Sequence, residues 1–253
     1  MKICNILGTN VSVTNIKETI DYIDKNLKKL KGRYICVSNV HTTIMAYESD
    51  EYRSVQNSAI NVLPDGAPLS LVSRIKGFKS AERVTGPDLM DHIFKISNDK
   101  KYRHYFYGST NQTLSKLKEN LILKYPNINI VGMYSPPFRE LFEEEEKKII
   151  DIINNTNPDF IWVGLGAPKQ EIWMYKQTNK LNGLMIGVGA GFDYFSGKIK
   201  RAPIWMQKLS LEWLYRLLQE PKRLFKRYFY TNSKFIVLII KEIIEDKLNK
   251  YKG

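Results

Sequence analysis

Three polar side chains that could take part in chemistry stand in loops that follow short apolar runs: Asn39, Asp65 and Gln170. A carboxylate such as that of Asp65 can accept the proton of an attacking hydroxyl group. Aspartate is also a common N-cap residue, so Asp65 could instead cap a helix expected to start near Pro68. The Asn39 side chain could likewise either contact a ligand or form a local Asx turn. The spacing alone does not choose between these roles.

Glycine-rich loops accompany these side chains, and the glycines of most interest are Gly108, Gly166, Gly189 and Gly191. Glycine allows the backbone to approach a ligand closely, and free amides at the start of a helix suit a phosphate group. Such glycines also make ordinary tight turns between a strand and a helix. Together, the loops favour ligand binding.

Familiar nucleotide-binding patterns are absent from the sequence. It contains no G-x-x-x-x-G-K-[ST] motif, and its late Gly187-x-Gly189-x-Gly191 run does not match the dinucleotide fingerprint G-x-G-x-x-G. No two aspartates stand at positions i and i+2, which removes the Asp-x-Asp metal site of many nucleotide-sugar transferases. If a diphosphate leaves in the reaction, arginines, lysines and backbone amides must stabilise it.

The segment from 198 to 228 combines large apolar side chains with nine lysines and arginines against two glutamates. This pattern is typical of a basic amphipathic helix, which we expect Pro221 to divide in two. Arg216, Arg223 and Arg227 are spaced to lie on one helical face. They could form a solvated basic stripe or bind an anion.

Short apolar runs alternate with amphipathic stretches over most of the chain, which predicts a mainly parallel sheet flanked by helices. Ligands bind such sheets at the carboxyl ends of the strands, where the polar and glycine-rich loops fall. The expected strands are Tyr34–Asn39, Ile60–Pro64, Tyr102–Tyr107, Ile128–Tyr134, Phe160–Gly164 and Leu184–Val188. The expected helices are Asn15–Leu30, Thr42–Gln56, Gly86–Ser97, Gln112–Lys124, Glu140–Asn154 and Pro168–Gln177.

The net charge of +13 on 253 residues predicts an anionic partner: nucleic acid, a phospholipid surface or a phosphorylated substrate. Two cysteines, Cys4 and Cys36, do not suggest a disulfide framework or a zinc site. We expect no signal peptide at the N-terminus. The late apolar run Phe235–Ile240 is far shorter than the roughly 20 residues of a membrane span, so any membrane contact should be peripheral.

Six longer motifs, in this order, resemble the WecG/TagA/CpsF family, glycosyltransferase family 26. The resemblance extends over about residues 5 to 230. The motifs are Val62–Gly66 (VLPDG), Arg83–Met90 (RVTGPDLM), Gly164–Glu171 (GLGAPKQE), Gly187–Asp193 (GVGAGFD), Lys200–Gln207 (KRAPIWMQ) and Leu211–Pro221 (LEWLYRLLQEP).

The resemblance implies an inverting, metal-independent transferase that needs no cofactor. Its donor would be a UDP-sugar, often UDP-N-acetylmannosamine or the uronic acid, and its acceptor a sugar on polyprenyl diphosphate. The products of the family feed wall teichoic acid, enterobacterial common antigen or capsular polysaccharide. It further implies a Rossmann-like α/β core over residues 1–197 and a basic helical appendage over 198–253, which would place a cytoplasmic protein on the inner face of the membrane. The chain could also form a homo-oligomer.

The resemblance also assigns roles to residues of this sequence. Asp65 matches the family's base. Three further residues belong to the catalytic set: Asn39, Gln170 and Arg83, of which Arg83 would pair with the diphosphate. UDP-sugar contacts are expected from Gly108, Gly166, Gly189, Gly191, Tyr134 and Asp193, the last two at the nucleoside. The diphosphate and the membrane surface would be bound by Arg216, Arg223 and Arg227.

One position departs from the family pattern Thr-x-Asn, because Val37 stands where a threonine is common. Valine has no hydroxyl group, so any hydroxyl role is lost there. Alternatives to the transferase are a basic nucleic-acid-binding α/β protein, a UDP-sugar epimerase or dehydrogenase, and a catalytically inactive scaffold for lipid-linked sugars. No RNP motif, zinc finger or helix-turn-helix supports nucleic-acid binding, and we expect no nucleic-acid partner.

Overall fold

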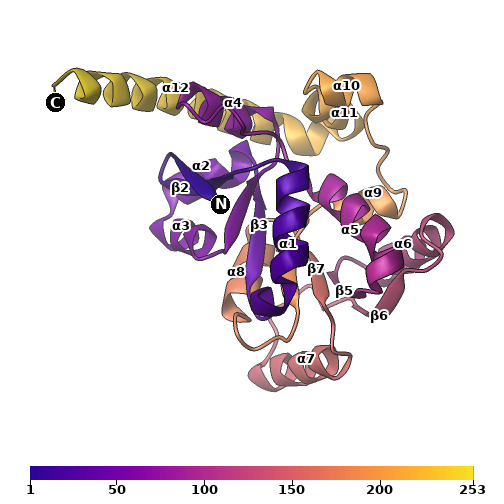
Figure 1. Ribbon diagram of the computed structural model, residues 1–253. Helices are drawn as coiled ribbons and strands as arrows, with labels where there is room; N and C mark the ends of the chain where they lie inside the picture. The colour runs from indigo at the N-terminus through magenta and orange to yellow at the C-terminus, as the bar shows by residue number, and fades with distance from the viewer. Residues whose placement is uncertain (253) are drawn as a thin grey trace.

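The computed structural model describes residues 1–252, and its centre is a six-stranded parallel sheet (Figure 1). The strand order is β4-β3-β8-β7-β5-β6. The expected parallel sheet is confirmed, with every strand boundary within one residue of its prediction. Gly253, the last residue of the predicted appendage, lies outside the described residues. The strands are β3 (Tyr34–Ser38), β4 (Asn61–Pro64), β5 (Arg103–Gly108), β6 (Asn129–Tyr134), β7 (Phe160–Gly164) and β8 (Leu184–Gly187).

The continuous apolar runs form strands because helices cover both faces of the sheet. In β7 the side chains of Phe160 and Trp162 enter one hydrophobic cluster, while those of Ile161 and Val163 enter another on the opposite face. This alternation follows from the two-residue period of a strand. One face is covered by α1 (Ile16–Leu30), α5 (Gly86–Lys100), α6 (Asn111–Lys124) and α9 (Gly191–Phe195), the other by α7 (Glu143–Asn155) and α8 (Lys169–Lys176). The fold is therefore Rossmann-like.

The helix expected over Thr42–Gln56 is two helices, α2 (Val40–Glu48) and α3 (Asp50–Asn57). Ser49 separates them because its backbone is extended and its side chain accepts a hydrogen bond from the Tyr52 amide, which caps α3. The two helices change direction at this residue and lie beside the carboxyl end of β3.

An antiparallel hairpin of β1 (Lys2–Ile6) and β2 (Thr9–Val13) precedes the sheet and was not expected from the sequence. Its side chains join a third hydrophobic cluster together with residues of α2 and of α4 (Ala67–Ile75). The Ser12 side chain also accepts a hydrogen bond from the Val62 amide, which ties the hairpin to β4.

The C-terminal segment forms α10 (Ile204–Lys208), α11 (Glu212–Gln219) and α12 (Pro221–Lys252). The break expected at Pro221 is confirmed, since α12 begins at this residue. Phe235 and Ile239 of α12 are buried in the cluster that holds the hairpin, α2 and α4. Figure 1 shows α12 running beside α4. The last helix is thus packed on the α/β core as well as extending from it.

Within residues 1–252, no helix combines the length and the apolar character that crossing a membrane requires.

Candidate active site

The predicted polar residues come together because the strands are parallel and their carboxyl ends share one edge of the sheet. Asn39 follows β3, Asp65 follows β4, and Gly108 ends β5. The loops containing Gly166 and Gly189 follow β7 and β8. This edge is where an open α/β sheet binds its ligands.

Asp65 does not cap a helix. The N-cap of α4 is Gly66, and α4 has no side-chain cap. The Asp65 amide donates to the Ser38 carbonyl at 2.6 Å, which joins the ends of β4 and β3. No hydrogen bond to the Asp65 carboxylate is found within residues 1–252. The side chain is partly exposed, so the structure leaves this carboxylate free to meet a ligand.

The surroundings of Asp65 favour its neutral form. Burial among protein atoms and, next, the negative charge of Glu212 raise the pKa of Asp65 to about 7, against the opposing charges of Arg83 and Arg216. A base is most effective when its pKa lies near the working pH. A partly exposed carboxyl group with a pKa near neutrality is suited to accept a proton from a bound hydroxyl group.

Asn39 is the N-cap of α2. Its side-chain oxygen accepts hydrogen bonds from the amides of His41 and Thr42, at 3.0 and 3.3 Å. The Thr42 hydroxyl in turn accepts from the Asn39 amide at 2.9 Å, which completes a capping box. This is the local structural role considered from the sequence, and the substrate contact of Asn39 stays a prediction.

Gln170 links two of the glycine-rich loops. It is 3% exposed, and its side-chain oxygen accepts from the Gly166 amide at 3.2 Å and from the Gly189 amide at 3.1 Å. Its side-chain nitrogen donates to the buried Glu171 carboxylate at 2.8 Å. Gln170 therefore fixes the loops after β7 and β8 relative to each other, and its predicted substrate contact stays untested.

Close packing accounts for two of the other glycines. Gly108 has a φ of +119°, and a Cβ atom there would lie 2.7 Å from the Gly164 backbone, so β5 and β7 could not approach each other with any other residue. A Cβ atom on Gly191 would lie 2.6 Å from the Met90 sulfur. These contacts support the turn interpretation, and UDP-sugar binding by these glycines stays a prediction.

Tyr134 is not brought near Asp65. It ends β6, whereas Asp65 follows β4, and these are the two edge strands of the sheet. Five strand spacings of about 4.8 Å separate them, roughly 24 Å. The Tyr134 ring stacks on Tyr107 at 5.9 Å, and Tyr107 stacks on Trp173 at 4.1 Å. The packing role of Tyr134 is thus visible, and the uracil contact stays a prediction.

Arg83 is paired, and its nearer partner comes from the C-terminal segment. Its Nη1 atom lies 3.0 Å from Glu212 Oε2, while Nη2 lies 4.0 Å from Asp88 Oδ2. Asp193 on α9 likewise pairs with Lys198, at 3.2 Å. Both predicted ligand residues are engaged with protein charges in this structure.

The three C-terminal arginines approach one another. The pKa of Arg227 is lowered by burial and further by Arg223 and Arg216. Arg223 pairs with Glu220 at 2.9 Å, and Arg216 lies 3.7 Å from the same carboxylate and over the Tyr194 ring. Arg227 has no acidic partner within the described residues, and its buried Nε atom has no acceptor. An anion would supply the missing acceptor.

His41 of α2 adjoins this arginine group. Burial, followed by the charge of Arg227, lowers the pKa of His41 to about 4, so the imidazole is neutral at physiological pH. Its buried Nδ1 atom has no hydrogen-bond partner within residues 1–252. Nothing in the sequence pattern links His41 to Arg227, because 186 positions separate them.

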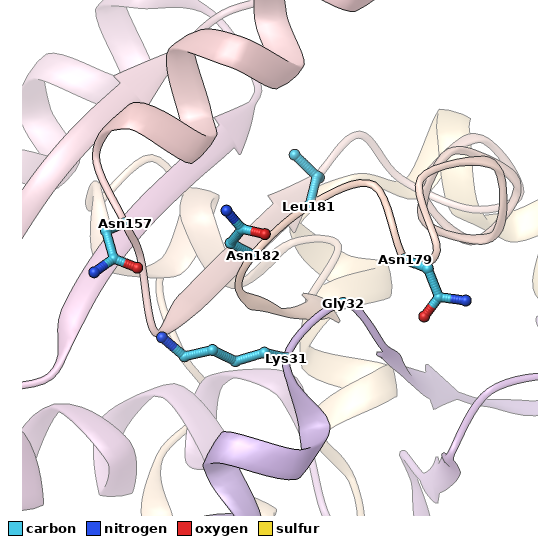
Figure 2. A pocket seen from close by; sticks show the side chains of 6 residues that line it. All are labelled: Lys31, Gly32, Asn157, Asn179, Leu181 and Asn182. Carbon is cyan, nitrogen blue, oxygen red and sulfur yellow. The ribbon is translucent and has the colours of Figure 1, made fainter.

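A depression of about 360 Å³ lies elsewhere, at the amino ends of the strands. Figure 2 shows its lining, to which Lys31, Asn157 and Asn182 contribute. Lys31 is paired with Asp159 at 3.2 Å. Because this depression is on the opposite edge of the sheet from Asp65, it is separate from the candidate active site. No group of three or more metal-ligating side chains is found among the described residues.

Comparison with known proteins gives consistent matches. The model of the glycosyl transferase WecG/TagA/CpsF family matches residues 4–249. An N-acetylglucosaminyldiphosphoundecaprenol N-acetyl-beta-D-mannosaminyltransferase of Bacillus subtilis is 31% identical, over 90% of this chain and 88% of the relative. A protein of Bacillus spizizenii with the same description is 31% identical, over 87% of this chain and 82% of the relative. One of Staphylococcus aureus is 28% identical, over 87% of this chain and 86% of the relative.

Proposed function

Because the chain belongs to the WecG/TagA/CpsF family and is a glycosyltransferase, we propose that it moves N-acetylmannosamine, or a related hexosamine or uronic acid, from a UDP-sugar to a sugar carried on polyprenyl diphosphate. The names of the relatives support this sugar and this acceptor. The product would enter the synthesis of a bacterial cell-surface polysaccharide such as teichoic acid or capsule.

The observation that carries the proposal is the Asp65 carboxyl group, which has no hydrogen-bond partner among the described residues and lies within range of the charges of Arg83 and Arg216. In an inverting transfer, the acceptor hydroxyl attacks the anomeric carbon in one step while a base removes its proton. The pKa of Asp65, raised to about 7 by burial, suits this role. Asp65 would take the proton as the bond to the UDP oxygen breaks.

The leaving UDP carries negative charge that must be stabilised. Arg227, with its unsatisfied buried Nε atom, is the first candidate to bind the diphosphate. Arg216 would approach from α11, and Arg223 from the first turn of α12. Guanidinium groups form strong charge-assisted hydrogen bonds with phosphate oxygens. With these three cations at one site, we propose that the reaction proceeds without a divalent metal.

The same segment is suited to contact a membrane surface. Large side chains of α10 to α12 are exposed, among them Trp205, Phe225 and Phe229, and the last two rings stack on each other. Lys222 and Lys226 are exposed beside them. Each basic residue near an anionic bilayer contributes about 1 kcal/mol, and shallow apolar side chains add to this. We propose peripheral binding at the cytoplasmic face, where the lipid-linked acceptor would be met.

A panel of UDP-sugars tests the proposal. The full chain is incubated with each donor and with N-acetylglucosamine on a polyprenyl diphosphate analogue, and products are identified by mass spectrometry. We expect an added N-acetylhexosamine mass with UDP-N-acetylmannosamine, in EDTA as well as in Mg²⁺. Loss of product in EDTA would contradict the metal-free mechanism, and no product with any donor would contradict the proposed substrates.

A further inference from the structure

Helix α11 lies next to the proposed base, and none of its residues is fully buried. Leu214 and Leu217 are partly buried, and polar contacts add to this attachment. The Gln219 side chain bonds both the amide and the carbonyl of Lys200, at 3.1 and 3.0 Å, and the Arg216 guanidinium lies 5.6 Å from the centre of the Tyr194 ring. The charge of Glu212 supplies a further attachment to the core.

Glu212 stands between two arginines from different parts of the chain. Its Oε2 atom is 3.0 Å from Arg83 Nη1, and its Oε1 atom is 3.3 Å from Arg201 Nε. Arg201 also pairs with Asp88 at 2.6 Å, and Asp88 accepts a hydrogen bond from the Thr85 hydroxyl at 2.7 Å. We call Arg83, Asp88, Arg201 and Glu212 the ion quartet.

The ion quartet is more shielded from water than an ordinary surface ion pair. Its four side chains are between 16% and 30% exposed. Partial shielding from water strengthens the attraction, and each carboxylate meets two guanidinium groups, so the charges form a network. The network joins the start of α5 to α11 across more than 120 residues of sequence.

Arg83 connects the ion quartet to Asp65. The Val84 amide donates to the Pro64 carbonyl at 2.8 Å, so the segment carrying Arg83 runs beside the end of β4. Arg83 thereby has three anionic groups within reach of its charge: Glu212, Asp88 and Asp65. Its hydrogen bond goes to Glu212. An arginine paired with Asp65 would make that carboxylate a weaker base.

We propose that Glu212 is a positioning residue for the transfer reaction. Glu212 docks α11 beside Asp65, and it holds the Arg83 guanidinium in an ion pair with α11, so that Arg83 does not pair with the Asp65 carboxylate. The inference rests on the proposed role of Asp65 as the base. The strength of Asp65 as a base then depends on the docking of α11, which also carries Arg216. Activation of the acceptor and binding of the diphosphate would then require the same docked state.

The charges around Asp65 agree with this role. After burial, Glu212 is the group that most raises the pKa of Asp65, and Asp88 of α5 acts in the same direction. Arg83 and Arg216 lower it, and the Tyr194 hydroxyl of α9 faces the same region. Removing the Glu212 charge takes away an anion and frees Arg83, so both changes lower the pKa of Asp65.

The test is Glu212→Gln in the full chain, with Glu145→Gln as the matched control. Glu145 also pairs with an arginine, Arg139, at 2.7 Å, at the start of α7. The carboxyl carbon of Asp65 is titrated by ¹³C NMR, and its signal is identified by its loss in Asp65→Asn. We expect the Asp65 pKa to fall by about one unit or more in Glu212→Gln, and to stay unchanged in Glu145→Gln.

A second variant and a second readout keep the outcomes separate. Arg201→Gln leaves the Glu212 charge in place but weakens docking, so we expect a smaller fall of the Asp65 pKa. In both variants the acid limb of the kcat/KM profile should move to lower pH with the NMR titration. An Asp65 pKa that Glu212→Gln does not move overturns the role of Glu212. An NMR shift without a matching shift of the acid limb overturns Asp65 as the base.

Discussion

Replacing Asp65 with asparagine is expected to stabilise the folded protein above pH 7, although it removes the proposed base. The pKa of Asp65 is raised from 3.8 to about 7 by burial and then by Glu212. Between these two values the folded state keeps a proton that the unfolded state has lost. Stability from this group is therefore complete below about pH 4 and lost as the pH rises through 7.

The size of the effect follows from the difference between the two pKa values. One unit of difference corresponds to about 1.4 kcal/mol, so the ionisation of Asp65 costs the wild-type protein about 4 kcal/mol above pH 7. About 2 kcal/mol of this loss falls between pH 5 and pH 7. Asparagine does not ionise, so the variant avoids the loss, and its advantage over the wild type should grow across this interval.

Urea unfolding followed by circular dichroism, repeated between about pH 5.5 and pH 8, measures this difference. Glu145→Gln is the control, because the hydrogen bond from Arg139 lowers the pKa of Glu145 to about 2 and leaves it ionised throughout this range. Its difference from the wild type should therefore be constant. A constant difference for Asp65→Asn as well would refute the raised pKa of Asp65.

Three further predictions concern the C-terminal segment. Arg227→Ala should weaken UDP binding in calorimetry by roughly 10- to 100-fold, the scale of hydrogen bonds to a charged group. The control Arg139→Ala should leave UDP binding unchanged, and an equal loss of UDP affinity in both variants would remove Arg227 from the diphosphate site. Phe235→Ala should lower the free energy of unfolding by about 3–5 kcal/mol, while Ile236→Ala, exposed on the same helix, should change it by less than about 0.5 kcal/mol. Phe225→Ser should reduce sedimentation with vesicles of phosphatidylglycerol and phosphatidylcholine, and unchanged sedimentation would place the membrane contact elsewhere.

The parallel sheet could be predicted from the sequence because each of its strands is a compact apolar run. Strands covered on both faces need apolar side chains at every position, as in Phe160–Val163, and such runs are visible without knowledge of the fold. The position of Asp65 at a strand end followed from the same pattern. The break at Pro221 followed from the chemistry of proline, which cannot continue a helix through its own position.

The partners of the site residues could not be predicted, because long-range charge pairs leave no periodic signal. The hydrogen bond of Arg83 goes to Glu212, 129 positions away. The sequence did not indicate that the Gln170 amide joins two loops of the chain. The N-terminal hairpin was missed because the strands were predicted from continuous apolar runs, and polar residues interrupt both hairpin strands.

The most direct test of the account is the turnover of Asp65→Asn with UDP-N-acetylmannosamine and N-acetylglucosamine on a polyprenyl diphosphate analogue. Asparagine has nearly the same shape as aspartate, and no helix cap is lost. UDP affinity should therefore stay close to that of the wild type, while turnover falls by roughly 10²- to 10⁴-fold, the usual range for loss of a general base. Turnover within a few-fold of the wild type would show that another group takes the proton and would contradict the central claim.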